Sequence, residues 1–320
     1  MIAKRFLLLA LLVIPTWALA LPHVLIIESY HPENSWDREY IQGIKSKLDG
    51  MAELSFFSLD TKRLPTDDHL NQATLAFRFM HEVNPELVIL GDDAALALMG
   101  PKLARMKMPT VFLGINADPT RYFENGKLPS TLTGVLERPQ YKSSFALINE
   151  LLPKARRILV LLDQERTSPI LRDEIAAVAD ARVHVQIVTS FEDWKNKVTQ
   201  APEQYDAILL GPYQALLDME QNNVDAQQVI HWTYHNSKIP LFGFWDFQIG
   251  REAALGGAVI TGFEQGAVAG AMAKAQLQLP QQTQAVRPSS PARIMLSRSQ
   301  IERWKMTVPA TLRNRVSWLP

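Results

Sequence analysis

The chain has 320 residues, of which 47% are hydrophobic and 21% charged, and its formal net charge is zero; this length allows two hydrophobic cores. A near-neutral chain without basic runs has no electrostatic attraction for nucleic acid, so we expect no partner of that class. Cysteine is absent, which excludes disulfides and thiol-linked lipids, so stability must come from hydrophobic packing.

The first 20 residues have the pattern of a secretory signal peptide. Lys4 and Arg5 precede an apolar run, and the run ends in the A-x-A site ALA at 18–20. An uncleaved anchor helix is the alternative, but Pro15 interrupts a run that is already short for a membrane span. We therefore expect cleavage after Ala20 and export to the periplasm.

After residue 20, segments with the pattern of strands alternate with segments with the pattern of helices. The strands are short apolar runs, and the helices place apolar residues three or four positions apart. In the first half, strands are expected over 24–29, 54–59, 87–90 and 110–115. The helices are expected over 38–48, over 69–83 and from the Ala-rich segment after Gly91 to Met106. Apolar strands separated by helices indicate a parallel sheet covered on both faces.

A second series follows the irregular segment 116–133, which contains Pro and Gly and has no clear period. Its expected strands are 157–162, 183–188, 207–210 and 240–244, and its expected helices are 141–152, 169–179, 191–198 and 226–236. Residues 263–279 are rich in Gly and Ala and predict a closely packed helix. A Pro/Gln/Ser linker at 280–293 then leads to a strand at 294–296 and a helical tail.

Two series of this kind predict two α/β lobes, each a doubly wound parallel sheet, with a hinge and a cleft between them. The first lobe would comprise residues 21–118 plus 244–280, and the second residues 119–243 plus 281–320. In open parallel sheets, ligands bind outside the carboxyl ends of the strands. The loops that follow the strands are therefore the expected binding region.

Polar and aromatic residues gather where the expected strands end. One polar loop is ordinary in an α/β protein, but six in series, with Trp36 close behind the first, favour a cleft that stacks on and hydrogen-bonds a small molecule. The clusters are Ser29-Tyr30-His31, Gly91-Asp92-Asp93, Asn116-Ala117-Asp118, Asp163-Gln164-Glu165, Gly211-Pro212-Tyr213 and Trp245-Asp246-Phe247. Asp92 or Asp93 could also act as the N-cap of the following helix, and the two roles can coexist.

Signatures of several enzyme classes are absent from the sequence. There is no glycine-rich dinucleotide fingerprint, no Walker A loop, no G-x-S-x-G elbow and no H-E-x-x-H motif. The strand-end residues form no obvious nucleophile, base and orienting group, so we expect binding without catalysis and without a cofactor. A hydrolase or isomerase that uses Asp92, Asp93 or His31 as general acid or base is the alternative.

Two histidines of the second half raise the question of a metal site. His231 and His235 are four residues apart on an expected helix and share one face. They could chelate a metal ion, or they could be two half-exposed histidines of an amphipathic helix. No cysteine or third histidine lies nearby in the sequence to complete a site, so we expect no metal.

Four segments together point to a known lineage. They are VLIIESYHPENSWDREYIQGIKSKL (24–48), INADPTRYFENGKLPSTLTGV (115–135), GGAVITGFEQGAVAGAMA (256–273) and RIMLSRSQIERWKMTVPATLRNRV (293–316). With them the chain after residue 20 resembles ABC-type solute-binding proteins of the type 1 periplasmic-binding fold, in the tryptophan- and tyrosine-type branch. None of the four segments is a catalytic signature.

The resemblance implies capture of a small solute in the periplasm and its delivery to an inner-membrane permease with its ATPase, and we expect a monomer. It implies ligand contacts from Ser29, Tyr30, Asp92, Asn116, Asp118, Tyr213 and Asp246, to which the strand-end pattern adds Trp36, Asp93 and Trp245. The family usually has a small residue and Thr or Ser where this chain has Asp92-Asp93. An acid there would repel the carboxylate of an amino acid unless the acid were paired.

The opening SYHPENSW (29–36) also resembles the extracytoplasmic sensor modules that are joined to histidine kinases and cyclic-dinucleotide enzymes. In that alternative, the protein reports its ligand to a membrane sensor instead of delivering it to a permease. The two alternatives share the fold and the ligand step, and they differ in the partner.

Overall fold

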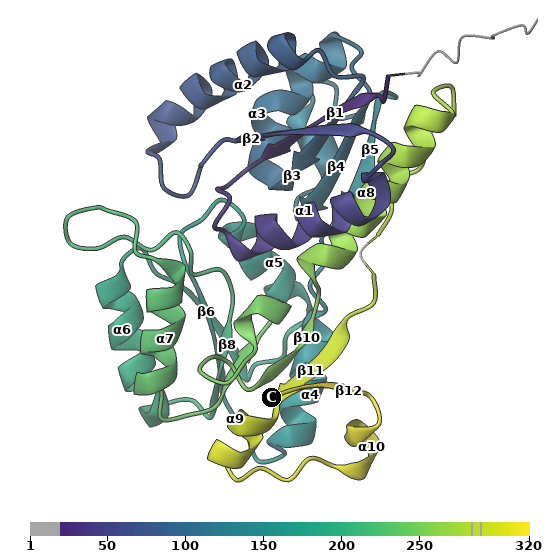
Figure 1. Cartoon of the computed structure of the whole chain (residues 1–320). Helices are drawn as coiled ribbons and strands as arrows, with labels where there is room; N and C mark the ends of the chain where they lie inside the picture. The colour runs from purple at the N-terminus through teal and green to yellow at the C-terminus, as the bar shows by residue number, and fades with distance from the viewer. Residues whose placement is uncertain (1–19, 283, 289) are drawn as a thin grey trace, which may run out of the picture.

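The computed structural model describes residues 20–282, 284–288 and 290–320. The predicted signal peptide, apart from its last residue Ala20, lies outside the described residues. In Figure 1 the chain forms two α/β lobes, one above the other. Among the described helices, none combines the length and the apolar character that a membrane span requires.

The first lobe is built on a five-stranded sheet of parallel pairs in the order β2-β1-β3-β4-β5. Its elements are β1 (His23–Glu28), β2 (Glu53–Ser58), β3 (Leu87–Gly91), β4 (Thr110–Ile115), β5 (Leu132–Leu136), α1 (Ser35–Leu48), α2 (His69–Val83), α3 (Asp92–Arg105) and α8 (Gly262–Gln278). Val24 and Ile26 of β1 belong to the core on the side of α1 and α8. Leu25 and Ile27 belong to the core on the side of α2 and α3 (Figure 1). Successive side chains of a strand point to opposite faces, so a strand buried on both faces is a continuous apolar run.

The second lobe is built on a seven-stranded sheet in the order β12-β11-β10-β9-β8-β6-β7, in which β10 and β11 are antiparallel and the other pairs parallel. Its elements are β6 (Ile158–Leu162), β7 (Val183–Ile187), β8 (Ala207–Leu210), β9 (Leu241–Gly243), β10 (Gly256–Val259), β11 (Arg293–Ser297), β12 (Val316–Leu319), α4 (Tyr141–Leu151), α5 (Ser168–Val178), α6 (Phe191–Gln200), α7 (Ala226–Asn236), α9 (Arg298–Arg303) and α10 (Ala310–Arg313). Val160 and Leu162 of β6 pack with α4 and α5. Leu159 and Leu161 pack with α6 and α7. The same alternation therefore buries both faces of this sheet.

The prediction of two lobes built on parallel sheets is confirmed, but two strands that were not predicted, β5 and β10, change the boundaries of the lobes. β5 belongs to the first sheet and β10 to the second, so the chain leaves the first lobe after residue 136 and returns to it after residue 259, in place of 118 and 244. Both strands contain glycines that weaken a strand pattern in the sequence. At Gly257 a Cβ would lie 2.0 Å from the carbonyl oxygen of Gly243, so the close approach of the neighbouring strand requires glycine. The tail, predicted as helical, ends in the strand β12.

The helices α1 and α8 pack against each other through glycines, in agreement with the close packing predicted for 263–279. A Cβ at Gly266 of α8 would lie 1.9 Å from the carbonyl oxygen of Tyr40, and one at Gly43 of α1 would lie 2.1 Å from that of Phe263. The two helix backbones are therefore in direct contact. This contact joins α8, which returns from the second lobe, to the opening segment of the chain.

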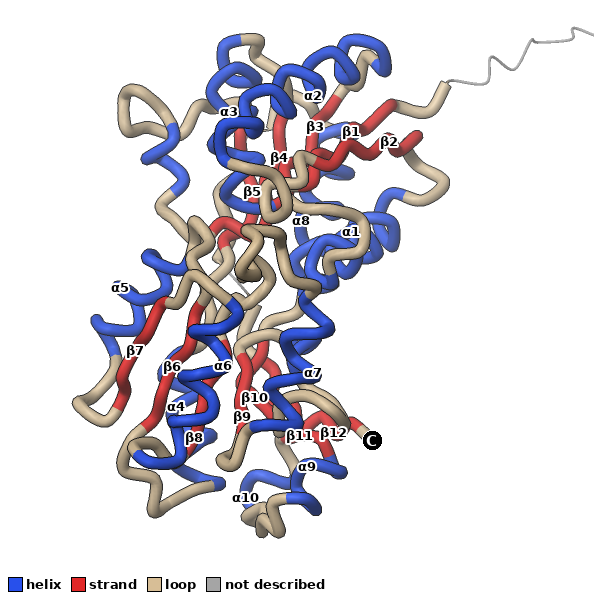
Figure 2. The backbone as a smooth tube through the Cα atoms, turned by 90° about the vertical axis from the view of Figure 1, so that its left-hand side faces the viewer, coloured by secondary structure: helices blue, strands red, loops and turns tan. Residues whose placement is uncertain are grey.

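In the described part of the chain, the lobes are connected three times: between β5 and α4, between β10 and α8, and between α8 and β11. Figure 2 shows these connections in the narrow region between the lobes, with the strands of the second sheet running toward it. Because the strands within each sheet are mainly parallel, their carboxyl ends gather at one edge of each sheet. These edges border the junction of the lobes.

Candidate functional site

A central pocket lies in the cleft between the lobes, and each strand of the first sheet is followed by a residue that lines it. The lining residues are Tyr30, Trp36, Lys62, Asp92, Asn116 and Glu137 on the side of the first sheet, and Thr167, Pro212, Gln214, Trp245 and Phe247 on the side of the second. The pocket has a volume of about 30 Å³, which is room for roughly one or two water molecules.

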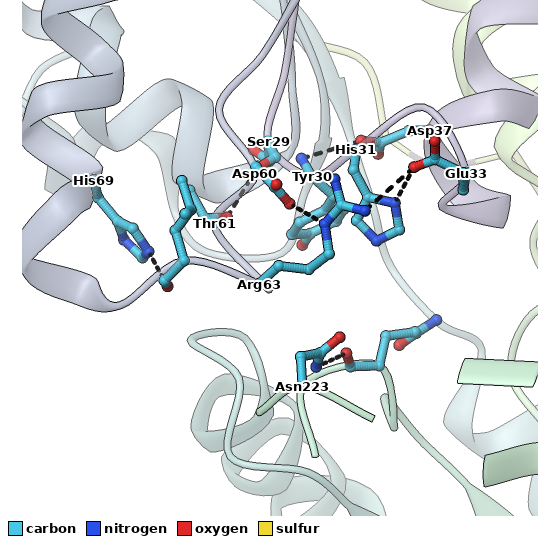
Figure 3. Close-up of polar contacts among 12 residues, drawn as sticks. Ser29, Tyr30, His31, Glu33, Asp37, Asp60, Thr61, Arg63, His69 and Asn223 are labelled. Carbon is cyan, nitrogen blue, oxygen red and sulfur yellow. Dashed lines mark hydrogen bonds and ion pairs between the residues drawn. The ribbon is translucent and has the colours of Figure 1, made fainter. Parts of the chain in front are cut away.

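Three larger hollows of the same cleft surround the central pocket, with volumes of about 560, 250 and 240 Å³. In the first, Arg63 and Thr66 face Glu165 and Arg166. In the second, Arg63 lies on one side and Asn223 on the other, as Figure 3 shows. The cleft therefore extends from the central pocket toward its charged outer rims.

Aromatic side chains from both lobes form much of the wall of the central pocket. Trp245 and Phe247 follow β9, and their rings stack with centroids 6.2 Å apart and planes 16° apart. Tyr30 and Trp36, near the end of β1 and the start of α1, are 2% and 4% exposed. The ammonium nitrogen of Lys62 lies 3.7 Å from the centre of the Tyr30 ring, a cation–π contact.

Two carboxyl groups face the central pocket from the first lobe. The Oε1 atom of Glu137 accepts a hydrogen bond from Nε1 of Trp245 at 2.7 Å, and Oε2 accepts one from Nδ2 of Asn116 at 3.2 Å. The Oδ1 atom of Asp92 accepts a hydrogen bond from the main-chain nitrogen of Asp93 at 2.7 Å. Asp92 has a φ of 76°, in the left-handed region that residues other than Gly, Asn and Asp seldom occupy.

Two further acids lie directly behind this wall and are fully buried. Asp93 accepts hydrogen bonds from the main-chain nitrogens of Asn116 and Ala117, at 2.8 and 3.2 Å, and from the hydroxyl of Tyr122 at 2.6 Å. Asp37 accepts one from the main-chain nitrogen of Tyr30 at 3.1 Å. These acids hold the loops after β1 and β4 in place.

Burial in this acidic surrounding raises the pKa of the carboxyl groups. Burial is the largest cause for Asp92, whose pKa rises to about 8; the charges of Asp93 and Glu165 add to the rise and that of Lys62 opposes it. The pKa of Glu137 is raised well above its usual value by burial and by the charge of Asp92. At neutral pH the site therefore retains protons unless a positive charge enters it.

Some buried polar atoms at the pocket have no hydrogen-bond partner among the described residues. They include Nε1 of Trp36 and Oδ1 of Asn116. Such atoms are expensive to bury without a partner, so they mark places where a ligand or water can bind. Trp36 and Asn116 both line the central pocket.

Of the ten residues predicted to contact a ligand, five line the central pocket: Tyr30, Trp36, Asp92, Asn116 and Trp245. Tyr213 borders an adjacent hollow of the cleft, and its ring packs on Trp194 with centroids 6.1 Å apart. Asp93 lies behind the wall, as described above. Half of the predicted side chains therefore line the central pocket, and the direction of each side chain is set by its hydrogen-bond and packing partners.

The other three predicted residues lie outside the central pocket and have other partners. The hydroxyl of Ser29 donates to the carbonyl oxygen of Gly91 at 2.6 Å and accepts from the main-chain nitrogen of Ala95 at 2.8 Å. Ser29 therefore provides a hydrogen-bond partner for a main-chain nitrogen in the first turn of α3. Neither Asp92 nor Asp93 serves as the side-chain N-cap of that helix. Asp118 is exposed and caps the 3₁₀-helix η2 (Pro119–Tyr122).

Asp246 begins the 3₁₀-helix η4 (Asp246–Gln248) and lies beside Glu39 of α1. Burial and the charge of Asp246 together raise the pKa of Glu39 to about 8. This second acid pair couples α1 to the segment after β9, outside the central pocket.

Six residues of the central pocket were not among the predicted ligand contacts: Lys62, Glu137, Thr167, Pro212, Gln214 and Phe247. Pro212 and Phe247 belong to clusters that the strand-end pattern had identified, whereas Lys62 follows the predicted strand 54–59, whose loop was not considered. Glu137 was missed because β5 was not predicted. The rule that one residue after each strand faces the site would have pointed to the loop that contains Lys62, but it could not reach Glu137 without the strand β5.

Other chemistry is less well supported by the geometry. Among the described residues that line the central pocket, there is no histidine or serine, and His31 lines a different hollow, where its Nδ1 pairs with Glu33 at 3.0 Å. The exposed His231 and His235 gain a third neighbour in Glu252, with ligand atoms within 4.8 Å of one another. His231 and Glu252 form an ion pair at 3.3 Å, which accounts for their proximity, and none of the three lines the central pocket.

Trp245→Phe is expected to destabilise the protein by ~1–3 kcal/mol, because it leaves a buried carboxyl oxygen of Glu137 without its donor. Urea unfolding measures the change. The matched control is Trp304→Phe at a half-buried tryptophan outside the cleft, which should change stability less. Equal losses for the two variants would contradict the importance of the hydrogen bond between Trp245 and Glu137.

No protein-family model matches the chain, and no curated protein matches it. Solved structures are similar to it over most of its length. One is an ABC domain in complex with L-Trp from Streptococcus pneumoniae, with 17% identity, a TM-score of 0.72 and coverage of 94% of this chain and 100% of that one. Another is a conserved domain protein from Vibrio cholerae, with 16% identity, a TM-score of 0.67 and coverage of 93% and 99%.

A third similar structure is the ligand-free, open form of a substrate binding protein with adhesive properties from Clostridium difficile, with 14% identity, a TM-score of 0.61 and coverage of 93% and 99%. Subunits of ABC transporters and transcription regulators of the LacI type are also similar. At these identities the likeness shows the fold alone. The chain has the type 1 periplasmic-binding fold, as the sequence predicted.

Proposed function

We propose that this protein is a periplasmic solute-binding protein that captures a small molecule in the cleft between its lobes and delivers it to an inner-membrane permease with its ATPase. The observation that carries the proposal is the central pocket, whose wall combines aromatic rings with polar groups from both lobes. Such a wall is typical of a ligand site. The described pocket residues contain no nucleophile and base pair, which favours binding without catalysis.

Binding would require the lobes to move, because the central pocket has a volume of only about 30 Å³. A small organic solute needs several times that volume. The three connections between the lobes are the natural hinge, since they alone would change conformation while each sheet stays rigid. In this proposal the lobes open to admit the solute, close on it, and present one joint surface to the permease.

The proposal also extends to the oligomeric state, the ligand class and the membrane partner of the protein. We infer a monomer that acts after export, as the pattern of the first 20 residues suggests. The tryptophan-type branch finds support in one similar structure, which holds L-Trp, but the acids of this pocket favour a different solute, as argued below. A membrane sensor in place of the permease would use the same cleft and the same closure.

Small-angle X-ray scattering tests the closure. A panel of sugars, amino acids and organic cations should contain a solute that lowers the radius of gyration and raises the unfolding temperature. Phe247→Ala should weaken binding of that solute about tenfold or more, because it removes a ring that lines the pocket. Phe263→Ala, at an exposed phenylalanine of α8, is the matched control and should bind normally.

The proposal fails if no compound of any class in the panel raises the unfolding temperature or compacts the protein. Compaction that survives in Phe247→Ala at unchanged affinity would place the ligand in another hollow of the cleft.

A further inference from the structure

The charges around the central pocket are unbalanced. Asp92 and Glu137 line it, and Asp37 and Asp93 lie fully buried behind them. Among the described residues, no arginine lines the pocket, and Lys62 is its only cationic side chain. The guanidinium of Arg138 lies nearby but donates to the main-chain oxygens of Ile115 and Asn116 at 2.8 and 2.7 Å. A ligand in the pocket therefore meets an excess of carboxyl groups.

The uncharged groups of the pocket also favour a ligand that is positive or donates hydrogen bonds. Tyr30, Trp36, Trp245 and Phe247 present aromatic rings, and the faces of such rings attract cations. Asn116 is 4% exposed, lines the pocket, and its Oδ1 has no partner among the described residues. Oxygen acceptors and ring faces together make a site for ammonium groups.

On the basis of the solute-binding function proposed above, we propose that the solute is an organic cation without a carboxylate, an amine or a quaternary ammonium compound. Its charged nitrogen binds against Asp92 and Glu137 and among the aromatic rings of the central pocket. An amino acid is disfavoured because its carboxylate would oppose the ionisation of the four surrounding acids, and Lys62 is the one cationic side chain among the described lining residues that could pair with it. A neutral sugar is disfavoured because it offers the acids no charge in return for their burial.

Lys62 already demonstrates this preference within the chain. Its ammonium nitrogen lies over the ring of Tyr30 at 3.7 Å. Its charge partly opposes the rise in the pKa of Asp92 and of Asp37 that burial causes. Lys62 lines both the central pocket and the largest hollow beside it, so it can withdraw toward the hollow when another cation enters. Lys62 therefore acts as an internal competitor for a cationic ligand and as an attractive partner for an anionic one.

Binding of a cation also changes the protonation of the site. A cation binds best when Asp92 is ionised, so affinity should rise with pH until Asp92 is ionised in the free protein as well. One released proton corresponds to at most about a tenfold rise in affinity per pH unit. The groups that face Asp92 come from its own helix and from neighbouring elements: Asp93 on its own helix, Asp37 and Tyr40 on α1, Tyr30 after β1, Lys62 after β2, Tyr122 in η2, Glu137 after β5 and Glu165 after β6. Binding of a neutral compound should show no such rise.

Choline and its neutral isostere 3,3-dimethylbutan-1-ol give a direct test with the full protein. Tryptophan fluorescence and calorimetry at pH 7.5 should show that choline, tetramethylammonium or putrescine binds about 100-fold more tightly than the isostere. Asp92→Asn should weaken binding of the cation about 30-fold or more, and Glu137→Gln provides a second variant should the first fold poorly. Asp68→Asn, at an exposed acid of the first lobe, is the matched control.

Lys62→Met separates the ligand classes further. It should raise the affinity for choline or putrescine severalfold, because the internal competitor is removed, whereas the affinity for an anionic ligand would fall.

L-tryptophan and ribose complete the panel. Binding of either of them in the absence of binding by any of the three cations overturns the cation proposal but leaves the solute-binding function standing. Equal affinity for choline and its isostere overturns it as well. If no compound binds, both proposals fail.

Discussion

Asp92→Asn is expected to make the protein more stable at pH 8, although it removes a carboxyl group from the central pocket. Burial, with the charges of Asp93 and Glu165, raises the pKa of Asp92 to about 8, compared with ~3.9 in an unfolded chain. The folded protein holds this proton over a range in which the unfolded chain releases it. The stability that the proton contributes at low pH is therefore lost as the pH rises from about 4 to about 8. Asparagine has no proton to lose and tolerates the φ of 76° at this position.

Urea unfolding at pH 5 and at pH 8 measures this effect. The free energy of unfolding of the unchanged protein should fall on the order of a few kcal/mol between the two, and Asp92→Asn should remove roughly half of that fall or more. Asp68→Asn, at an exposed acid of the same lobe, should leave the pH dependence as it is. If Asp92→Asn has the same pH dependence as the unchanged protein, then Asp92 is already ionised at pH 5 in the folded state.

Gly266→Ala is expected to destabilise the first lobe by ~2 kcal/mol. This loss is expected even though alanine favours a helix by about 1 kcal/mol relative to glycine. The added Cβ would lie 1.9 Å from the carbonyl oxygen of Tyr40 and 2.7 Å from its Cα. Both are main-chain atoms of α1, so no change of side-chain conformation relieves the overlap. The helices must separate, and the core between them and the sheet loosens.

Thermal unfolding of three glycine variants tests this explanation. At Gly270 the nearest atom to an added Cβ is 3.0 Å away, and at Gly250 it is 3.9 Å away. The loss of stability should therefore be largest for Gly266→Ala, smaller for Gly270→Ala and close to zero for Gly250→Ala. Three equal losses would mean that the contact between α1 and α8 adjusts more freely than its glycines suggest.

Much of the fold could be predicted from the sequence because the strands are buried on both faces. β1, β3, β4, β6 and β8 are continuous apolar runs, and all of them except β4 are followed by a helix with apolar residues at helical spacing. Tyr30, Asp92 and Asn116 were found by the rule that ligands meet the carboxyl ends of parallel strands. This rule needs the position of the strand alone, which the apolar run supplies.

The rest of the site could not be predicted because it depends on contacts between distant segments. β5 and β10 owe their place in the sheets to glycines that fit against a neighbouring backbone, and glycine weakens a strand pattern. Ser29 and Asp93 follow strands just as Tyr30 and Asp92 do, yet their side chains turn inward. The main chain around α3 and β4 needs their hydrogen bonds, and a local pattern does not contain those partners.

The hydrogen bond from Trp245 to Glu137 connects a segment that follows the first sheet with one that follows the second. The indole N–H of Trp245 therefore both satisfies an acid that faces the pocket and connects the two lobes. Thermodynamic coupling is reciprocal. If a bound solute favours one angle between the lobes by a certain factor, then holding the lobes at that angle raises the affinity for the solute by the same factor. Under the proposed function, a permease that docks on both lobes would lower the affinity for the solute by rotating them, with no direct contact to the solute itself.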